Sequence, residues 1–413
     1  MLSRRSFLYL STTALIGALA ARSGLSYAAD KSVKVGINLP FTGADAHDAE
    51  LIKDGALLAI DDANASGGVV GYKIEVMLLD DGTATAGQYD PAQAATNARK
   101  MVSDKQVVAA IGPQMSGSGK AMSPILSQGD LATITPSSTN PDITDAKFAG
   151  QYRPKGKAIY FRTVTTDAFQ GPNMANYYAD VLKVKSVYVL DDSGAYGVGI
   201  ANAFEAQAKA RGINVLGHDQ LNPREADYTT TITKIKSLNP DALYYGGVAQ
   251  AGVKVVKQAS DILPHMIKGG GDGLYGAEIL RGAGFPAAEG WYATIAAPNI
   301  LERPEAAPIV ERFAKKYGQQ PENYSITAYD AALVILDAIK QVAGSGKEVT
   351  REAVRDAIQT SRVKTIQGEI TFDDNGDLTN RVISVFRIEK NDKYPLDDVL
   401  HQYKYIGVAP PSA

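Results

Sequence analysis

Hydroxyl side chains follow two consecutive apolar runs of this sequence, where together they could bind an anion. The run at 107–112 is followed by Ser116, which stands among small residues at the start of a predicted helix. Backbone N–H groups at a helix N-terminus, joined by a serine hydroxyl, can hold a carboxylate or a phosphate. An ordinary capping loop without a ligand is the alternative for either loop taken alone. The run at 131–136 is followed by three more hydroxyl side chains: Ser137, Ser138 and Thr139.

Two segments of the sequence match nucleotide-binding motifs only in part. A phosphate-binding P-loop would need Gly and Ser or Thr where this chain has Gln114 and Ala121. The G-x-G-x-x-G string at 271–276 lacks the acidic residue expected about 20 positions later, since Ala296 stands there. We therefore interpret Asp272, between two of these glycines, as a carboxylate held in a turn and facing a cleft, where it would bind a cation.

The sequence offers no supported catalytic or metal-binding constellation. The four histidines are scattered without ligand spacing. The acidic turn at 373–377 begins like a calcium loop, but Leu378 and Ser384 occupy its sixth and twelfth positions. We expect no enzymatic activity, no metal and no cofactor, and an exported cofactor-dependent oxidoreductase is the remote alternative.

The charge and the cysteine content limit the kinds of partner that this protein can have. Lys and Arg number 42 against 45 Asp and Glu, a net charge of −3, so no basic excess exists to hold a nucleic acid backbone. The absence of cysteine excludes disulfides, thiolate metal sites and lipid attachment through cysteine. We expect neither a nucleic acid partner nor a lipid anchor.

Residues 1–28 have the features of a cleaved export signal. Arg4 and Arg5 precede an apolar stretch at 8–21, and 26–28 form a small-x-small cleavage site. The apolar stretch is shorter than the roughly 20 residues of a membrane-spanning helix. The paired arginines indicate the twin-arginine route, with the general secretory route as the alternative. We expect the mature protein in the periplasm.

Strand-like and helical segments alternate along the rest of the chain. The run at 33–38 is typical of a strand, and 49–64 carries a helical apolar stripe. This alternation predicts an α/β fold with parallel sheets covered by helices on both faces, and its restart after residue 163 predicts two lobes. Ligands of such sheets bind beyond the carboxyl ends of the strands, where the hydroxyl loops lie.

Eight strings, in this order and spacing, resemble one family: the type I periplasmic solute-binding proteins of the leucine/isoleucine/valine-binding kind, which feed ABC importers. The strings are VGINLPFTG at 35–43, DGALLAIDDANASGGVVG at 54–71, IGPQMSGSG at 111–119, ITPSSTNPDIT at 134–144, FRTVTTDAFQGPNMA at 161–175, DDSGAYGVG at 191–199, DALYYGG at 241–247 and GEITFDDNGDL at 368–378.

The resemblance implies two Rossmann-like lobes with parallel central sheets, joined by a three-stranded hinge and closing on ligand like a Venus flytrap. The chain would cross between the lobes near Arg162, Ala296 and Gly368. The N-terminal lobe would then comprise 29–162 plus 297–367. The C-terminal lobe would comprise 163–296 plus 368–413.

The resemblance also implies a ligand site for an α-amino acid. Ser116 and Thr139 would bind the α-carboxylate by hydroxyl and backbone N–H, with Ser138 in the same loop. The Ser137 carbonyl and Asp272 would bind the α-ammonium. Two aromatic residues complete the site: Tyr196, closing over the ligand from the second lobe, and Tyr324, lining the side-chain pocket.

Asp48 departs from the family pattern, because the branched-chain binder has an aromatic residue there. A carboxylate in the side-chain pocket would be costly beside an aliphatic ligand. Either Asp48 points to solvent or the ligand carries a polar or basic distal group.

These features predict the substrate-binding component of an ABC importer. It would bind an amino acid in the inter-lobe cleft, deliver it to a permease in the inner membrane, and act as a monomer. A binding protein for aromatic carboxylates or for small amides such as urea is the alternative within the same fold.

Overall fold

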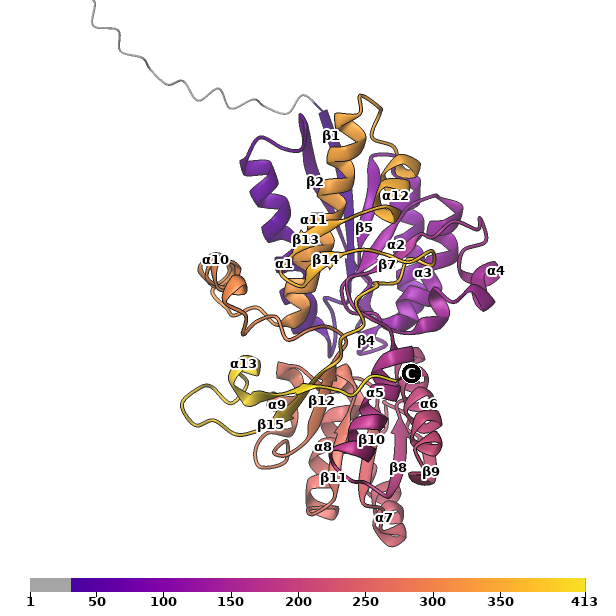
Figure 1. Ribbon diagram of the computed structural model, residues 1–413, viewed down its shortest axis with the longest axis vertical. Coiled ribbons are helices and arrows are strands. Elements are labelled where there is room, and N and C mark those ends of the chain that lie inside the picture. Colours follow the sequence, from indigo (N-terminus) through magenta and orange to yellow (C-terminus); the bar gives the residue numbers. More distant parts are fainter. Residues whose placement is uncertain (1–30, 413) are drawn as a thin grey trace, which may run out of the picture.

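The computed structural model describes residues 31–412, so the predicted export signal lies outside the described residues. The structure is built on two sheets, each covered by helices, and the two resulting lobes are stacked end to end (Figure 1). The predicted α/β class with parallel central sheets is confirmed.

The first lobe contains a five-stranded sheet in which every pairing is parallel. Its strands, in spatial order, are β2 (Tyr72–Asp80), β1 (Lys31–Leu39), β5 (Val107–Ile111), β6 (Thr133–Thr135) and β7 (Tyr160–Arg162). β5 is buried along its whole length, which explains why it is a continuous apolar run.

Helices cover both faces of this sheet, and each face has its own hydrophobic core. Helices α1, α11 and α12 pack on one face, and α2 and α3 pack on the other. The helices of this lobe are α1 (Ala46–Ala65), α2 (Pro91–Ser103), α3 (Ser116–Gln128), α4 (Ala149–Tyr152), α10 (Ala307–Tyr317), α11 (Asn323–Gly344) and α12 (Arg351–Gln359). Two small hairpins add β3 (Gly82–Thr83) with β4 (Gln88–Tyr89), and β13 (Val363–Thr365) with β14 (Gly368–Ile370).

The second lobe contains a seven-stranded sheet that is parallel at its centre and antiparallel at one edge. β15 pairs antiparallel with both β12 and β16, so the C-terminal segment extends a sheet begun by earlier strands. The strands, in spatial order, are β16 (Tyr403–Val408), β15 (Ser384–Ile388), β12 (Tyr292–Ile295), β11 (Ile267–Gly270), β10 (Ala242–Gly246), β8 (Ser186–Asp191) and β9 (Asn214–Gln220). The helices are α5 (Asp167–Asp180), α6 (Ala195–Ala210), α7 (Thr229–Leu238), α8 (Ala249–Ile262), α9 (Ala277–Ala283) and α13 (Val399–Gln402).

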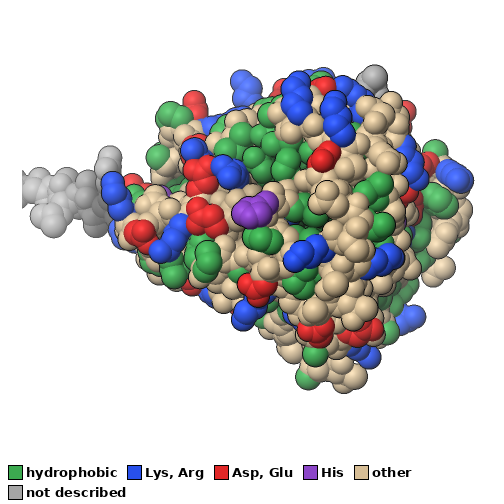
Figure 2. Space-filling model, turned by 90° about the horizontal axis from the view of Figure 1, so that it is seen from below, with side chains coloured by type: hydrophobic (Ala, Val, Ile, Leu, Met, Phe, Trp, Pro, Cys, Tyr) green, Lys and Arg blue, Asp and Glu red, His purple; other side chains and the backbone are tan. Residues whose placement is uncertain are grey.

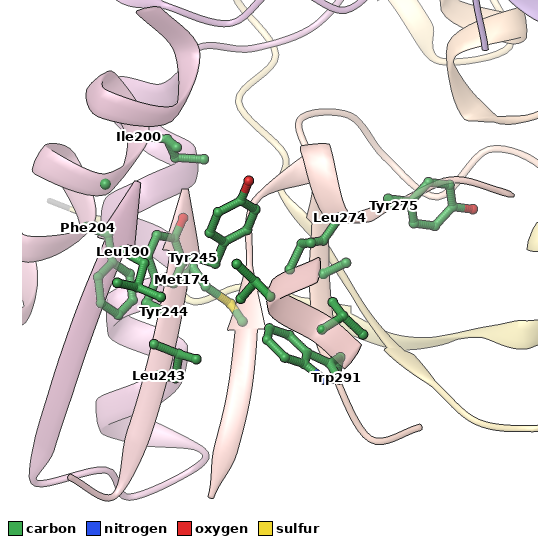
Figure 3. Close-up of a cluster of buried hydrophobic side chains, with 14 of the residues drawn as sticks. Met174, Leu190, Ile200, Phe204, Leu243, Tyr244, Tyr245, Leu274, Tyr275 and Trp291 are labelled. Carbon is green, nitrogen blue, oxygen red and sulfur yellow. The ribbon is translucent and has the colours of Figure 1, made fainter. Parts of the chain in front are cut away.

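Aromatic side chains dominate the core of the second lobe (Figure 3). The Phe204 and Tyr244 rings stack with their centroids 3.7 Å apart, and the Tyr178 ring meets Phe204 edge-on at 5.1 Å. Tyr275 lies apart from the other labelled side chains (Figure 3), and its hydroxyl accepts a hydrogen bond of 2.9 Å from Asn323 of the first lobe. The rigid aromatic core therefore reaches the boundary between the lobes.

The third passage between the lobes lies later in the chain than the sequence predicts. Ile370 and Leu378 belong to the core of the first lobe, and Ile383 belongs to that of the second. The chain therefore passes over between Leu378 and Ile383, after Gly368. The hairpin β13–β14 explains the difference, because it packs on the first lobe and joins neither large sheet.

The view from below in Figure 2 shows Lys and Arg side chains interspersed with Asp and Glu. This face presents no broad patch of one charge. Among the described residues, no helix combines the length and the apolar composition that a membrane crossing requires.

Close packing of α1 on α11 depends on Gly55. A Cβ atom there would lie 1.9 Å from the backbone oxygen of Ser325. We expect Gly55→Ala to lower the free energy of unfolding by about 1–3 kcal/mol, because the helices must separate, although Ala normally stabilises a helix. Gly344→Ala, at the end of α11 with nothing within 4 Å, is the matched control and should not destabilise. Urea unfolding of both variants tests this, and equal stabilities would contradict it.

Candidate ligand-binding site

A cavity lies between the two lobes, beyond the carboxyl ends of their central strands. Both lobes contribute to its wall, as expected for a ligand that holds two lobes together. Six residues singled out from the sequence line it: Asp48, Ser116, Ser137, Tyr196, Asp272 and Tyr324.

One part of the wall is suited to an anion. Ser116 is the first residue of α3, and no side chain caps this helix. The Ser116 hydroxyl oxygen accepts hydrogen bonds of 3.2 Å from the Ser138 hydroxyl and from the Asn140 backbone N–H. Its own proton is therefore free to be donated into the cavity. Together with the N–H groups of the first turn, it can hold a carboxylate.

Arg162 fixes the loop that supports Ser116. Its buried guanidinium donates to the backbone oxygens of Ser138 at 2.5 Å and Asn140 at 2.8 Å, and its Nε lies 2.7 Å from an Asp377 carboxylate oxygen. These bonds connect the end of β7, the loop after β6 and the acidic turn that the sequence likened to a calcium loop. The acidic turn at 373–377 therefore supplies the carboxylate of Asp377 as the counter-ion of Arg162.

The structure places Ser138 and Thr139 behind the cavity wall. The Ser138 hydroxyl donates to Ser116, and the Thr139 hydroxyl donates at 2.9 Å to a carboxylate oxygen of Asp167. Both residues are buried and neither lines the cavity. The sequence predicts that the Thr139 hydroxyl binds a ligand carboxylate, whereas in the structure this hydroxyl donates its hydrogen bond to Asp167.

Another part of the wall is suited to a cation. Asp272 follows β11, and its carboxylate accepts hydrogen bonds from the Gln170 amide at 2.7 Å and from the Tyr324 hydroxyl. Burial raises the pKa of Asp272, and hydrogen bonds from Tyr196, Tyr324 and Gln170 act in the opposite direction. These donors hold the carboxylate in one orientation at the cavity surface.

Contacts across the cavity join the lobes. Tyr324 belongs to α11 of the first lobe and Asp272 to the second lobe, so their hydrogen bond crosses the boundary. Nearby, the Asn140 side-chain amide donates to the Ala195 backbone oxygen at 2.7 Å. Tyr196 follows Ala195 in α6, and its hydroxyl accepts a 3.1 Å hydrogen bond from Gly273 N–H. The described conformation therefore has the lobes in contact around the cavity.

Asp48 faces the cavity from the first turn of α1. Burial raises its pKa well above the ordinary value, and the charges of Glu322, Glu278 and Asp45 raise it further. The sequence left open whether Asp48 points to solvent or into the pocket, and in the structure it lines the pocket.

Several lining residues were missed by the sequence reasoning. Asp45 and Gln114 follow β1 and β5, so the rule that found Ser116 could have found them. Val248 follows β10 and Tyr275 follows β11, so the same rule could have found them as well. Asp167 lies behind the wall, where burial and the Asp272 charge raise its pKa well above normal.

The glycines at 271–276 serve packing around Asp272. A Cβ atom on Gly271 would lie 2.2 Å from the Tyr196 hydroxyl oxygen, and one on Gly273 would lie 2.1 Å from the Gly247 backbone oxygen. The space that a dinucleotide pyrophosphate would need is therefore filled by the protein's own atoms. Within residues 31–412, no group of three or more His, Asp or Glu side chains is arranged to hold a metal ion.

Comparisons with known proteins agree with this architecture. The leucine-, isoleucine- and valine-binding protein BraC3 of Rhizobium johnstonii is 31% identical over 376 residues, covering 91% of this chain and 96% of that protein. The crystal structure of the leucine-binding protein LivK from Thermotoga maritima has a TM-score of 0.77 and 26% identity, covering 91% of this chain and 98% of the other.

A solute-binding protein from R. palustris, solved in complex with benzoate, shares the fold with a TM-score of 0.76 at 20% identity, covering 92% of this chain and 97% of the other. The family model for periplasmic binding proteins matches residues 32–393. The resemblance inferred from the sequence strings is thereby confirmed. The chain belongs to the periplasmic binding protein family, among the substrate-binding proteins of branched-chain amino acid ABC transporters.

Proposed function

We propose that this protein binds an α-amino acid in the inter-lobe cavity and delivers it to an ABC permease in the inner membrane. The proposal depends on one observation: Asp272 and Ser116 both line the same cavity. A carboxylate held by three donors suits an α-ammonium, and a hydroxyl at an uncapped helix N-terminus suits an α-carboxylate. The set is complementary to a zwitterion.

The relatives support this class of ligand, since BraC3 is named for binding leucine, isoleucine and valine. The predicted signal at 1–28 supports action in the periplasm, with twin-arginine export remaining a prediction. The binding role needs no catalytic group, which agrees with a family of binding proteins rather than enzymes.

An aromatic carboxylate is the second candidate, because the R. palustris neighbour was solved with benzoate. The wall of the cavity argues against it here. Its lining, within the described residues, includes Asp45, Asp48 and Asp272 and no Lys, Arg or His. An anion without an ammonium group would leave the buried Asp272 carboxylate without a cation and beside a second negative charge, which costs free energy.

Thermal unfolding of the protein, after its co-purified ligand has been removed, tests the proposal. The panel comprises the standard amino acids, benzoate, 4-hydroxybenzoate, urea and acetamide. We expect at least one α-amino acid to raise the melting temperature, because a ligand at 100 times its Kd stabilises by about 2.7 kcal/mol. Its N-acetyl derivative should have no effect, since the ammonium is lost. Stabilisation by aromatic acids alone would overturn the proposal.

A further inference from the structure

Three carboxyl groups near the cavity each leave one oxygen without a hydrogen-bond partner in the part of the chain that the structure describes. Asp45, only 3% exposed, leaves Oδ2 without a donor, and Asp48 leaves Oδ1 without one. Glu278 of α9, in the second lobe, leaves Oε2 unpaired. Asp45 and Asp48 line the cavity, and burial, together with the charge of Glu278, raises the pKa of both.

Among the described residues, Arg281 pairs with Glu278, and no Lys, Arg or His pairs with Asp45 or Asp48. Arg281 Nη1 lies 3.7 Å from Glu278 Oε1, but its Nε is engaged at 2.8 Å with Asp397 on the outer surface. Burial lowers the pKa of the nearby His47, which favours its neutral form. Glu322 is a further acid beside this group, and burial, with the charge of Glu278, raises its pKa to about 8.

Buried carboxylates without a cation are unfavourable. Burial, with the charge of Glu278, raises the pKa of Asp45 to about 7, which reflects the cost of ionising it. A cationic group placed between the lobes would remove that cost and would attract all three acids. A positively charged group at the end of an amino acid side chain suits this place, because Asp45 and Asp48 line the same cavity as Asp272 and Ser116.

We infer that Asp45, Asp48 and Glu278 form a second subsite, which selects amino acids whose side chain ends in an ammonium or guanidinium group. The inference rests on the proposed function, because Asp272 and Ser116 must hold the α-ammonium and α-carboxylate. Tyr324 links the two parts of the site, since its hydroxyl bonds to Asp272 and its side chain also experiences the Asp48 charge. Gln114, 7% exposed in the same wall, leaves its side-chain oxygen free for one more N–H donor.

Calorimetric titration with matched ligand pairs tests the subsite. Lysine is compared with norleucine, ornithine with norvaline, and arginine with citrulline, so each pair differs chiefly in the distal charge. We expect at least one basic member to bind tenfold or more tightly than its neutral counterpart. Asp48→Asn should abolish that preference, because the basic member of each pair loses the charge that it pairs with. Glu50→Gln, an acid on the same helix that does not line the cavity, should leave the preference unchanged.

The outcomes separate this inference from the proposed function. If leucine or norleucine binds and every basic member binds no better than its neutral partner, the subsite is wrong and the amino acid receptor stands. If no amino acid binds, both are wrong. The pairs measured on the parent protein decide the matter even if Asp48→Asn does not fold.

Discussion

Asp272→Asn will weaken binding of the cognate amino acid roughly 30-fold or more. The substitution keeps the size of the side chain and removes the charge that faces the ligand's α-ammonium. Truncating one partner of a buried, hydrogen-bonded charge pair costs about 2–5 kcal/mol, and about 1.4 kcal/mol corresponds to tenfold in affinity. The single amide oxygen also cannot accept the hydrogen bonds that Gln170 and Tyr324 now donate to two oxygens.

Calorimetric titration of the variant against the parent measures this effect. Asp261→Asn, an exposed acid at the end of α8, is the matched control and should bind as the parent does. A ligand analogue without the α-amino group should show little difference between Asp272→Asn and the parent, because it lacks the group that Asp272 recognises. Affinity for the intact amino acid within twofold of the parent value would contradict the role of Asp272.

The stability of the ligand-free variant provides an independent readout. Asp167 lies near Asp272, and burial together with the Asp272 charge raises the pKa of the Asp167 carboxyl. Removing one of two like charges from a buried site relieves repulsion and offsets the hydrogen bond that the amide loses, so we expect ligand-free Asp272→Asn to melt close to the parent temperature. Reduced binding together with unimpaired stability distinguishes a ligand contact from a structural group.

The architecture was predictable because the central strands are buried on both faces. Such strands need apolar residues at every position, so β5 is a continuous run, and the helices between strands carry stripes. The end of β5 then points to Ser116, and the end of β11 points to Asp272, because ligands bind where parallel strands end. The antiparallel edge formed by β15 and β16 could not be predicted in the same way, because the order of strands in a sheet does not depend on local sequence.

The side-chain orientations in the site were not predictable from local pattern. Ser137 and Thr139 stand in one loop with similar side chains, yet only Ser137 lines the cavity. Thr139 turns toward Asp167, which follows a later strand, so its orientation depends on a tertiary contact. The approach of Asp48 to Glu278 depends on how the lobes meet, and no periodicity in either helix encodes that.

The dependence on tertiary contacts also explains why residues 271–276 match a dinucleotide-binding motif without forming such a site. Gly271 and Gly273 are required by Tyr196 and Gly247, which lie far away in the sequence. Spacing alone cannot distinguish glycines that admit a phosphate from glycines that admit a neighbouring side chain. The missing acid downstream was the better signal, and the structure agrees with it.

Arg162→Met will lower the free energy of unfolding by about 3–5 kcal/mol, the usual loss when one partner of a buried ion pair is removed. Arg162 is 0% exposed, and methionine would occupy part of its volume without donating a hydrogen bond. The backbone oxygens of Ser138 and Asn140 would lose their donors, and Asp377 would lose its cation. Each buried acceptor left unpaired costs about 1–3 kcal/mol.

The same variant should also lose ligand affinity, because Arg162 holds the loop whose Asn140 N–H and Ser138 hydroxyl orient Ser116. Equilibrium urea unfolding measures the first effect, and titration of the folded variant measures the second. Arg312→Met is the matched control: Arg312 pairs with Asp62 on the surface, where such ion pairs contribute about 0–1 kcal/mol. If Arg162→Met destabilised the protein no more than Arg312→Met, the guanidinium would not be what fixes the anion-binding loop, and the support assigned here to Ser116 would have to come from the backbone alone.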